Sequence, residues 1–225
     1  MRSLKELINT TEPGWDLVKQ WIDSAKNKIE ILPVDSASAS KALYEIQVST
    51  RSPMGAIIYG TGGILIDHGW IRILGSGSPE IKRSLPDWNK GKSIDGSGDS
   101  PPFLLVADDV LGGFFLLNGG GLGNDPGKMY YWSPDDFDIE PMDLTYSEFL
   151  LFCFNNDLGK YYEGYRWNGW KEEISKINGD QAIQILPPLW TKEGKDFSKH
   201  SRRAVPVEEM WSVRMQIRKQ LQEKK

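Results

Sequence analysis

The chain carries few of the side chains that bind metals or act as nucleophiles. Its 225 residues include one cysteine, Cys153, and two histidines, His68 and His200. One cysteine excludes an intrachain disulfide and any zinc site with more than one thiolate, and neither histidine has a second ligand at metal-binding spacing. Cys153 lies in the apolar run Phe149–Phe154 and is expected to be a buried apolar side chain. We therefore expect no metal centre and no cofactor.

The chain also lacks long apolar runs and an excess of positive charge. No apolar stretch approaches the ~20 residues that span a bilayer, and the first ten residues, MRSLKELINT, contain no apolar segment typical of a signal peptide. The 27 Lys and Arg against 31 Asp and Glu give a net charge of −4, so no overall positive field would attract phosphates. We expect a cytoplasmic protein with no membrane or nucleic-acid partner and leave its oligomeric state open.

Apolar and aromatic side chains are abundant enough for one core. Hydrophobic residues make up 39% of the chain and include nine tryptophans. Between residues 56 and 142 they form short runs separated by glycine and aspartate turns, a pattern that predicts antiparallel strands. The expected strands are Ala56–Tyr59, Ile64–Asp67, Trp70–Leu74, Phe103–Ala107, Gly113–Leu117, Lys128–Trp132 and one near Phe137–Met142.

Helical patterns lie mainly before and after these strands. We expect helices within residues 3–46, over 78–85, from Thr145 to Ile177 and over 206–225. Because helices and strands are segregated, the sequence predicts a single α+β domain over residues 1–225, with a twisted, mostly antiparallel sheet flanked by N- and C-terminal helices. Residues 89–100 are polar and glycine-rich and are expected to form a flexible loop.

Carboxylates at two places could form a site. Asp108 and Asp109 are neighbours in a strand region, so their side chains should point to opposite faces, and turn or cap roles are favoured. If the loop from Asn118 to Asp125 folded back on them, the four oxygen-bearing side chains could bind a divalent cation. The spacing does not match an EF-hand loop.

Residues 161–170, YYEGYRWNGW, have the most unusual composition in the chain. Their aromatic side chains and Arg166 could form a binding platform or an arginine–aromatic stack. The favoured interpretation is that Trp167 and Trp170 pack against the sheet and that Arg166 pairs with a carboxylate.

Several segments together resemble a bacterial family known only as a domain of unknown function. They are RSPMGAIIYGTGGILIDHGWIRILGSG (51–77), GGFFLLNGG (112–120), YRWNGW (165–170) and PPLWTKEG (187–194). A second resemblance, carried by FLLVADDVLGGFFLLNGGG, GKMYYW and YSEFLLF, is to the SUKH superfamily of immunity proteins. That resemblance implies an α+β fold and a role in binding a protein, often a toxin.

Together these observations favour a non-enzymatic bacterial protein that binds a partner in an immunity-like role. The acidic balance would suit a basic protein partner such as a toxin domain. The alternative is a small-molecule-binding or hydrolytic enzyme with a cleft lined by Asp108, Asp109, Asn118, Asp125 and Arg166. A concave pocket with convergent polar groups would favour the alternative, whereas a flat, acidic, aromatic-rimmed face would favour the protein binder.

Overall fold

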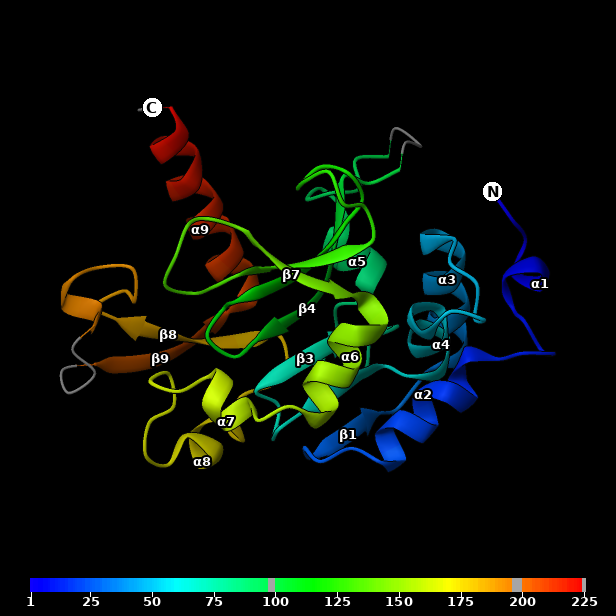
Figure 1. Cartoon of the computed structure of the whole chain (residues 1–225), viewed down its shortest axis with the longest axis horizontal. Helices are drawn as coiled ribbons and strands as arrows, with labels where there is room; N and C mark the ends of the chain where they lie inside the picture. The colour runs from blue at the N-terminus through cyan, green and yellow to red at the C-terminus, as the bar shows by residue number, and fades with distance from the viewer. Residues whose placement is uncertain (97–99, 196–199, 224–225) are drawn as a thin grey trace.

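Apolar strand segments in the first two-thirds of the chain build one antiparallel sheet. The computed structural model describes residues 1–96, 100–195 and 200–223. Seven strands lie side by side in the order of the sequence, so the sheet is one continuous meander (Figure 1). They are β1 (Ile29–Leu32), β2 (Gly63–Ile66), β3 (Ile71–Leu74), β4 (Phe103–Asp109), β5 (Phe114–Asn118), β6 (Lys128–Trp132) and β7 (Glu140–Thr145).

A smaller two-stranded sheet precedes the C-terminal helix. Strands β8 (Gln181–Leu186) and β9 (Ser201–Pro206) pair antiparallel, and α9 (Val207–Gln222) follows directly. Arg214 of α9 is fully buried and donates hydrogen bonds to the carbonyl oxygens of Gly112, Ser133 and Asp136. Since those carbonyls belong to the turns after β4 and β6, Arg214 fixes the helix to the main sheet.

The remaining helices cover the sheet from several sides. In Figure 1, α1–α4 gather at the end of the molecule opposite α9, and α6 crosses in front of the strands. Their bounds are α1 (Leu4–Leu7), α2 (Gly14–Asp23), α3 (Ser36–Ile46), α4 (Pro53–Gly60), α5 (Leu85–Asn89), α6 (Tyr146–Asn155), α7 (Leu158–Tyr161) and α8 (Trp170–Ile174), with a 3₁₀ turn η1 at Glu193–Lys195. Among the described residues, no helix has the length and apolar character needed to cross a bilayer.

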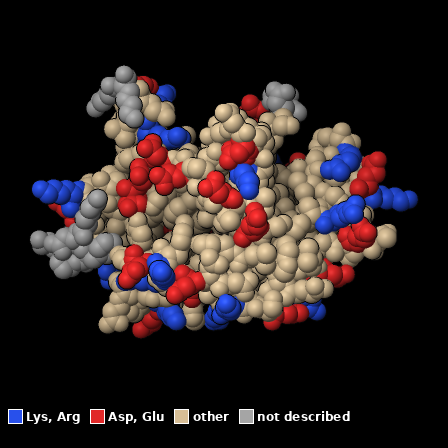
Figure 2. All heavy atoms as spheres, viewed as in Figure 1, with Lys and Arg blue, Asp and Glu red and all other residues tan. Residues whose placement is uncertain are grey.

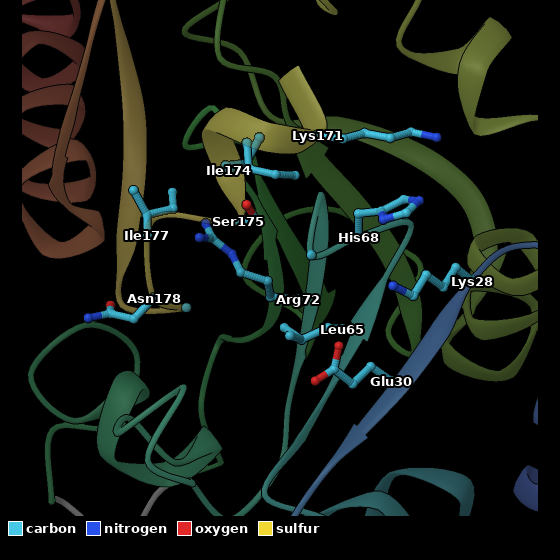
Figure 3. A pocket seen from close by; sticks show the side chains of 13 residues that line it. Lys28, Glu30, Leu65, His68, Arg72, Lys171, Ile174, Ser175, Ile177 and Asn178 are labelled. Atoms are coloured by element: carbon cyan, nitrogen blue, oxygen red, sulfur yellow. The ribbon is translucent and has the colours of Figure 1, made fainter. Parts of the chain in front are cut away.

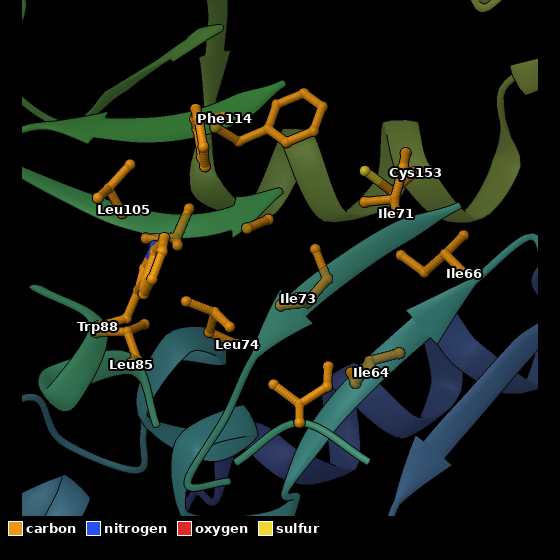
Figure 4. Packing of buried hydrophobic residues seen from close by; sticks show 14 of the residues in the cluster. Ile64, Ile66, Ile71, Ile73, Leu74, Leu85, Trp88, Leu105, Phe114 and Cys153 are labelled. Carbon is orange, nitrogen blue, oxygen red and sulfur yellow. The ribbon is translucent and has the colours of Figure 1, made fainter. Parts of the chain in front are cut away.

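The core lies on both faces of β2–β5. Ile64, Ile66, Ile71 and Ile73 are all fully buried and share one face, because Ile64 pairs with Ile73 and Ile66 with Ile71 across β2 and β3. Phe114 and Phe115 are neighbours in β5 and are also fully buried, so both faces of the sheet are covered there. Figure 4 shows these isoleucines in one cluster with residues of α5 and with Cys153 of α6. The predicted burial of Cys153 and the α+β single-domain fold are confirmed.

Two predicted elements are wrong. Residues 56–59 belong to helix α4, which Ser52 caps by accepting from the Gly55 N–H, with Pro53 at the first helical position. The segment is buried almost all round, and a short apolar run of that kind has no period that separates a helix from a strand. Residues 78–85 do not form a helix. Ser78 caps a single turn, after which the Lys82 N–H binds Asp180, and Ser84 starts α5.

Other boundaries move by a few residues, and one strand is new. Strand β7 begins at Glu140, near the end of the range predicted for it, and α8 is a short helix near the end of the Thr145–Ile177 region in which helices were expected. Strand β9 was not predicted, because SRRAVP has no clear alternation. The C-terminal helix starts as expected, immediately after Pro206.

The segment predicted as a flexible loop begins inside the core. Asn89 ends α5, is fully buried, and exchanges hydrogen bonds with the backbone of Leu105 in β4. Ser93 is also buried and donates to the Asn89 side chain. Residues 97–99 of the predicted loop lie outside the described residues.

Candidate functional site

The four carboxylate and amide residues of the alternative oxygen cluster lie at opposite ends of one hairpin. In the β4–β5 register Phe103 faces Asn118, whereas Asp108 faces Phe114. Asn118 and Asp125 are therefore separated from Asp108 and Asp109 by the length of these strands, so these residues do not come together in the alternative cation cluster or cleft. Among the described residues, no three His, Cys, Asp or Glu side chains are arranged to hold a metal ion.

Asp108 is the centre of a buried ion-pair network. It is fully buried, and its two carboxylate oxygens lie 2.5 Å from Arg72 Nη2 and 2.5 Å from Arg83 Nη1. Arg72 and Asp108 are directly opposite in the β3–β4 register, which places their side chains on the same face. Arg83 also contacts Asp180, at 3.3 Å. Asp108 therefore does not have the turn role that the sequence favoured.

Asp109 points the other way, as adjacent strand residues do. One carboxylate oxygen accepts from the backbone N–H groups of Leu111 and Gly113, both at 2.9 Å, and the other accepts from the Tyr131 hydroxyl at 2.6 Å. These bonds close the β4–β5 turn, which is the predicted turn role. Burial raises the pKa of Asp109, although the bonds to Tyr131 and the backbone oppose the shift.

Asn118 and Asp125 hold the loop between β5 and β6. The Asn118 amide donates to Asp125 Oδ1 at 2.9 Å, and its carbonyl oxygen accepts from the N–H groups of Gly120 and Leu122. The Tyr130 hydroxyl donates to the same Asp125 oxygen at 2.7 Å. These contacts account for both side chains as loop-closing groups.

Arg166 pairs with a carboxylate and also stacks on aromatic rings. Its Nη2 lies 2.5 Å from Asp67 Oδ2, and its guanidinium lies 4.8 Å from the Trp70 ring centre and 4.5 Å from that of Trp170. Trp170 packs edge-on against Trp70 at 5.0 Å between ring centres. The ion pair and the stack, offered by the sequence as separate roles, occur together.

Both predicted tryptophans pack against the core but remain half-exposed. Trp167 Nε1 donates to Glu173 at 2.7 Å, and the Arg202 guanidinium lies 4.8 Å from the Trp167 ring. The fully buried tryptophan beneath them is Trp70, which sequence reasoning placed in a strand without singling it out. The packing interpretation for Trp167 and Trp170 therefore holds only in part.

A hollow of about 250 Å³ lies beside this aromatic cluster, between the β2–β3 hairpin and α8. We call it the hairpin pocket. Figure 3 shows Lys28 and His68 on one side of it and Ser175 and Ile177 on the other, with Arg72 between them. The lining residues are Lys28, Glu30, Leu65, His68, Gly69, Arg72, Val110, Lys171, Ile174, Ser175, Ile177, Asn178 and Gly179.

His68, which lines the pocket, lies in a turn with left-handed backbone conformation. Asp67 and His68 have φ angles of 49° and 63°, and Gly69 follows with 86°, so the hairpin turn runs through three consecutive left-handed residues. Non-glycine residues adopt this conformation at an energetic cost and are found at functional sites more often than elsewhere. Burial lowers the pKa of His68, and the nearby ammonium groups of Lys171 and Lys28 lower it further.

Sequence reasoning did not find this pocket. The Asp67-His68-Gly69 segment has the composition of a turn, and the backbone forms one there, but Lys28, Arg72 and Lys171 had no motif that linked them to His68. These residues come from β3 and from the segments around β1 and α8, which only tertiary packing brings together. The one available signal was two non-glycine residues in a short Asp-His-Gly turn.

A separate surface is strongly acidic. From residue 129 to residue 159 there is no Lys, Arg or His. Figure 2 shows acidic side chains gathered over the β6–β7 loop and β7, the last strand of the sheet. The acidic residues of this stretch are Asp135, Asp136, Asp138, Glu140, Asp143, Glu148 and Asp157, and all are exposed.

Comparison with known proteins gives relatives without an assigned activity. An uncharacterized protein of Haemophilus influenzae is 46% identical over 208 residues, covering 92% of this chain and 91% of the relative. A putative uncharacterized protein of Escherichia coli, YbfG, is 38% identical over 218 residues, covering 97% and 98%. No solved structure matches. The family described as "Protein of unknown function DUF2625" matches residues 4–210, so the chain belongs to this bacterial family of unknown function.

Proposed function

We propose that the chain binds a small polar molecule in the hairpin pocket. The observation that carries the proposal is the convergence of charged side chains from separate segments on one hollow that apolar side chains also line. Ligand sites in proteins combine these features, with a few polar groups to orient the ligand and apolar walls to hold it. This is the small-molecule alternative reached from the sequence, supported now by a different set of residues.

Nuclear magnetic resonance can test the pocket because the chain has two histidines, and His68 is in its wall. A library of small polar compounds is screened for saturable shifts of the His68 ring signals. We expect hits that compete with one another and that are lost in Ser175→Trp, which fills the pocket. Lys176→Trp places the same bulk on the neighbouring residue, which does not line the pocket, and should leave binding intact.

The proposal fails if no compound shifts His68 saturably. It also fails if hits bind Ser175→Trp as tightly as the unmodified chain. Thermal unfolding of both tryptophan variants checks that loss of binding does not come from loss of the fold.

The second candidate is the immunity-like role, in which the chain binds a basic protein such as a toxin domain. The acidic, exposed 129–159 stretch supports it, because complementary charge accelerates and orients protein association. Strand β7 contains Pro141 and a left-handed residue, Asp143, with φ 58°. Such residues protect edge strands from pairing with another strand, so we propose docking through side chains at this edge.

Charge reversal tests this second candidate. The unmodified chain should bind a basic protein partner at about 50 mM salt and release it at higher salt. A triple variant should not bind this partner at about 50 mM salt; it carries Asp138→Lys, Glu140→Lys and Asp143→Lys. A control with two exposed acidic residues outside the stretch reversed, Asp23→Lys and Glu163→Lys, should retain it. The purified partner must then show the same difference, and equal binding by both variants would contradict the proposal.

A further inference from the structure

We propose that the ligand of the hairpin pocket is a small organic anion, bearing a carboxylate or phosphate, and that His68 takes up a proton when it binds. The inference rests on the proposed function and names the class of molecule that the pocket accepts. It is carried by the charges in the wall, an unused donor on Arg72 and the position of His68.

Two ammonium groups at the pocket have no carboxylate partner among the described residues, although Lys171 lies over the Trp170 ring. Among the described residues, neither Lys28 nor Lys171 forms an ion pair, and Glu30 is the acidic residue that lines the pocket. The neighbouring acids are already paired, Asp67 with Arg166 and Asp108 with Arg72. A ligand that enters the pocket therefore meets two ammonium groups that form no ion pair among the described residues, and one carboxylate, which favours a negatively charged group.

Arg72 adds a donor that nothing in the described residues accepts. The residue is 1% exposed, and its terminal nitrogens bind Asp108 and the carbonyl oxygens of Asp109 and Gln181. Its Nε–H has no hydrogen-bond partner within residues 1–96, 100–195 and 200–223. Buried N–H groups are almost always paired, and this one belongs to a side chain that lines the pocket. An oxyanion in the pocket would supply the missing acceptor.

The position of His68 links binding to protonation. Its imidazole is flanked by Lys28 and Lys171, and both ammonium groups act on its charge. A bound anion offsets this positive field and stabilises the imidazolium, so anion affinity should increase as the pH falls through the titration of His68. The charged groups that face this region from the surrounding elements are Lys28, Glu30, Asp67, Arg72, Arg166 and Lys171.

The apolar walls favour a carbon skeleton attached to the charged group. Leu65, Val110, Ile174 and Ile177 line the pocket together with the cations. A space of about 250 Å³ is smaller than the range typical for drug-sized ligands. The pocket therefore fits a short-chain organic acid or phosphate ester better than a nucleotide.

The experiment compares probes that differ in charge but not in size. Succinate and succinamide are titrated into the full chain at constant ionic strength, with inorganic phosphate as a third probe. The His68 ring signals and the Arg72 Nε–H signal are followed from pH 6 to pH 8, where succinate keeps most of its two charges. We expect succinate to shift both signals saturably, to raise the pKa of His68, and to bind more tightly at pH 6 than at pH 8, whereas succinamide should do none of these.

Substitution of the lysines identifies the groups that hold the charge. Lys28→Met and Lys171→Met should each weaken succinate binding about tenfold, the loss expected for one charge-assisted contact. Lys176→Met is the matched control, because Lys176 pairs with Glu172 outside the pocket, and it should bind as the unmodified chain does.

The outcomes separate this inference from the proposed function. If succinamide binds as well as succinate and shifts His68, the pocket is a ligand site but the anion assignment is overturned. If succinate binds without any change in the pKa of His68, the coupling to protonation is overturned. If succinate, succinamide and phosphate all fail to shift His68 at millimolar concentration while other library compounds do so, the anion assignment fails and the proposed function stands.

Discussion

Loss of the Asp108 carboxylate should be among the most destabilising single changes in this protein. Its oxygens each lie 2.5 Å from a guanidinium, on Arg72 and on Arg83, whose side chains are 2% and 9% exposed. Asp108→Asn keeps the shape and removes the charge, which leaves two buried cations with one fewer counter-charge. Removing one member of a buried pair costs about 3–5 kcal/mol. For a domain of this size that corresponds to a fall in Tm of roughly 6–20 °C.

Urea unfolding followed by tryptophan fluorescence measures this loss. Glu12→Gln is the control, because the Glu12–Arg51 pair is 2.6 Å long but its side chains are 63% and 67% exposed. An exposed pair contributes at most about 1 kcal/mol. Asp108→Leu combined with Arg72→Met should recover much of the stability, since apolar residues can replace a buried pair and Arg83 keeps Asp180. A loss below about 1 kcal/mol in Asp108→Asn would refute the reasoning.

Three further changes test the groups around the site. Asp109→Asn should remove one component of the pH dependence of stability. Burial raises the pKa of Asp109, so the contribution of this carboxyl group to stability falls as the pH rises above about 4. A variant profile parallel to that of the unmodified chain in urea unfolding would contradict this. Trp70→Ala should cost about 3–5 kcal/mol of unfolding free energy and Trp170→Ala less, because Trp70 is fully buried and Trp170 is half-exposed. Equal losses in denaturant unfolding would contradict the assignment of Trp70 as the core of the aromatic cluster. Gly113→Ala should cost about 1–3 kcal/mol of stability, because a Cβ at this position would lie 2.5 Å from the Tyr131 hydroxyl and displace the Asp109–Tyr131 hydrogen bond. Ultraviolet titration of tyrosine should then show a hydroxyl that ionises more readily than in the unmodified chain.

The sequence by itself determined the elements whose signal is local. The strands of the 103–132 region follow from apolar runs separated by glycine turns, and Thr145 with Glu148 marks the start of α6 by a capping box that the structure contains. The opposite directions of Asp108 and Asp109 follow from strand geometry alone. The fold class follows from the segregation of helices and strands, because the order of these elements along the chain can be predicted without knowledge of long-range contacts.

Only the tertiary structure decided the identity of α4 and the position of the hairpin pocket. Residues 53–60 are apolar on nearly every side, so burial beside helices α2 and α3, and not a period in the sequence, selects the helix. The pocket needs Lys28, His68 and Lys171 at one place, although 143 positions separate the first from the last (171 − 28). Propensities and caps act over a few residues, whereas a site made of side chains from distant segments depends on sheet register and helix packing, which a single sequence does not display.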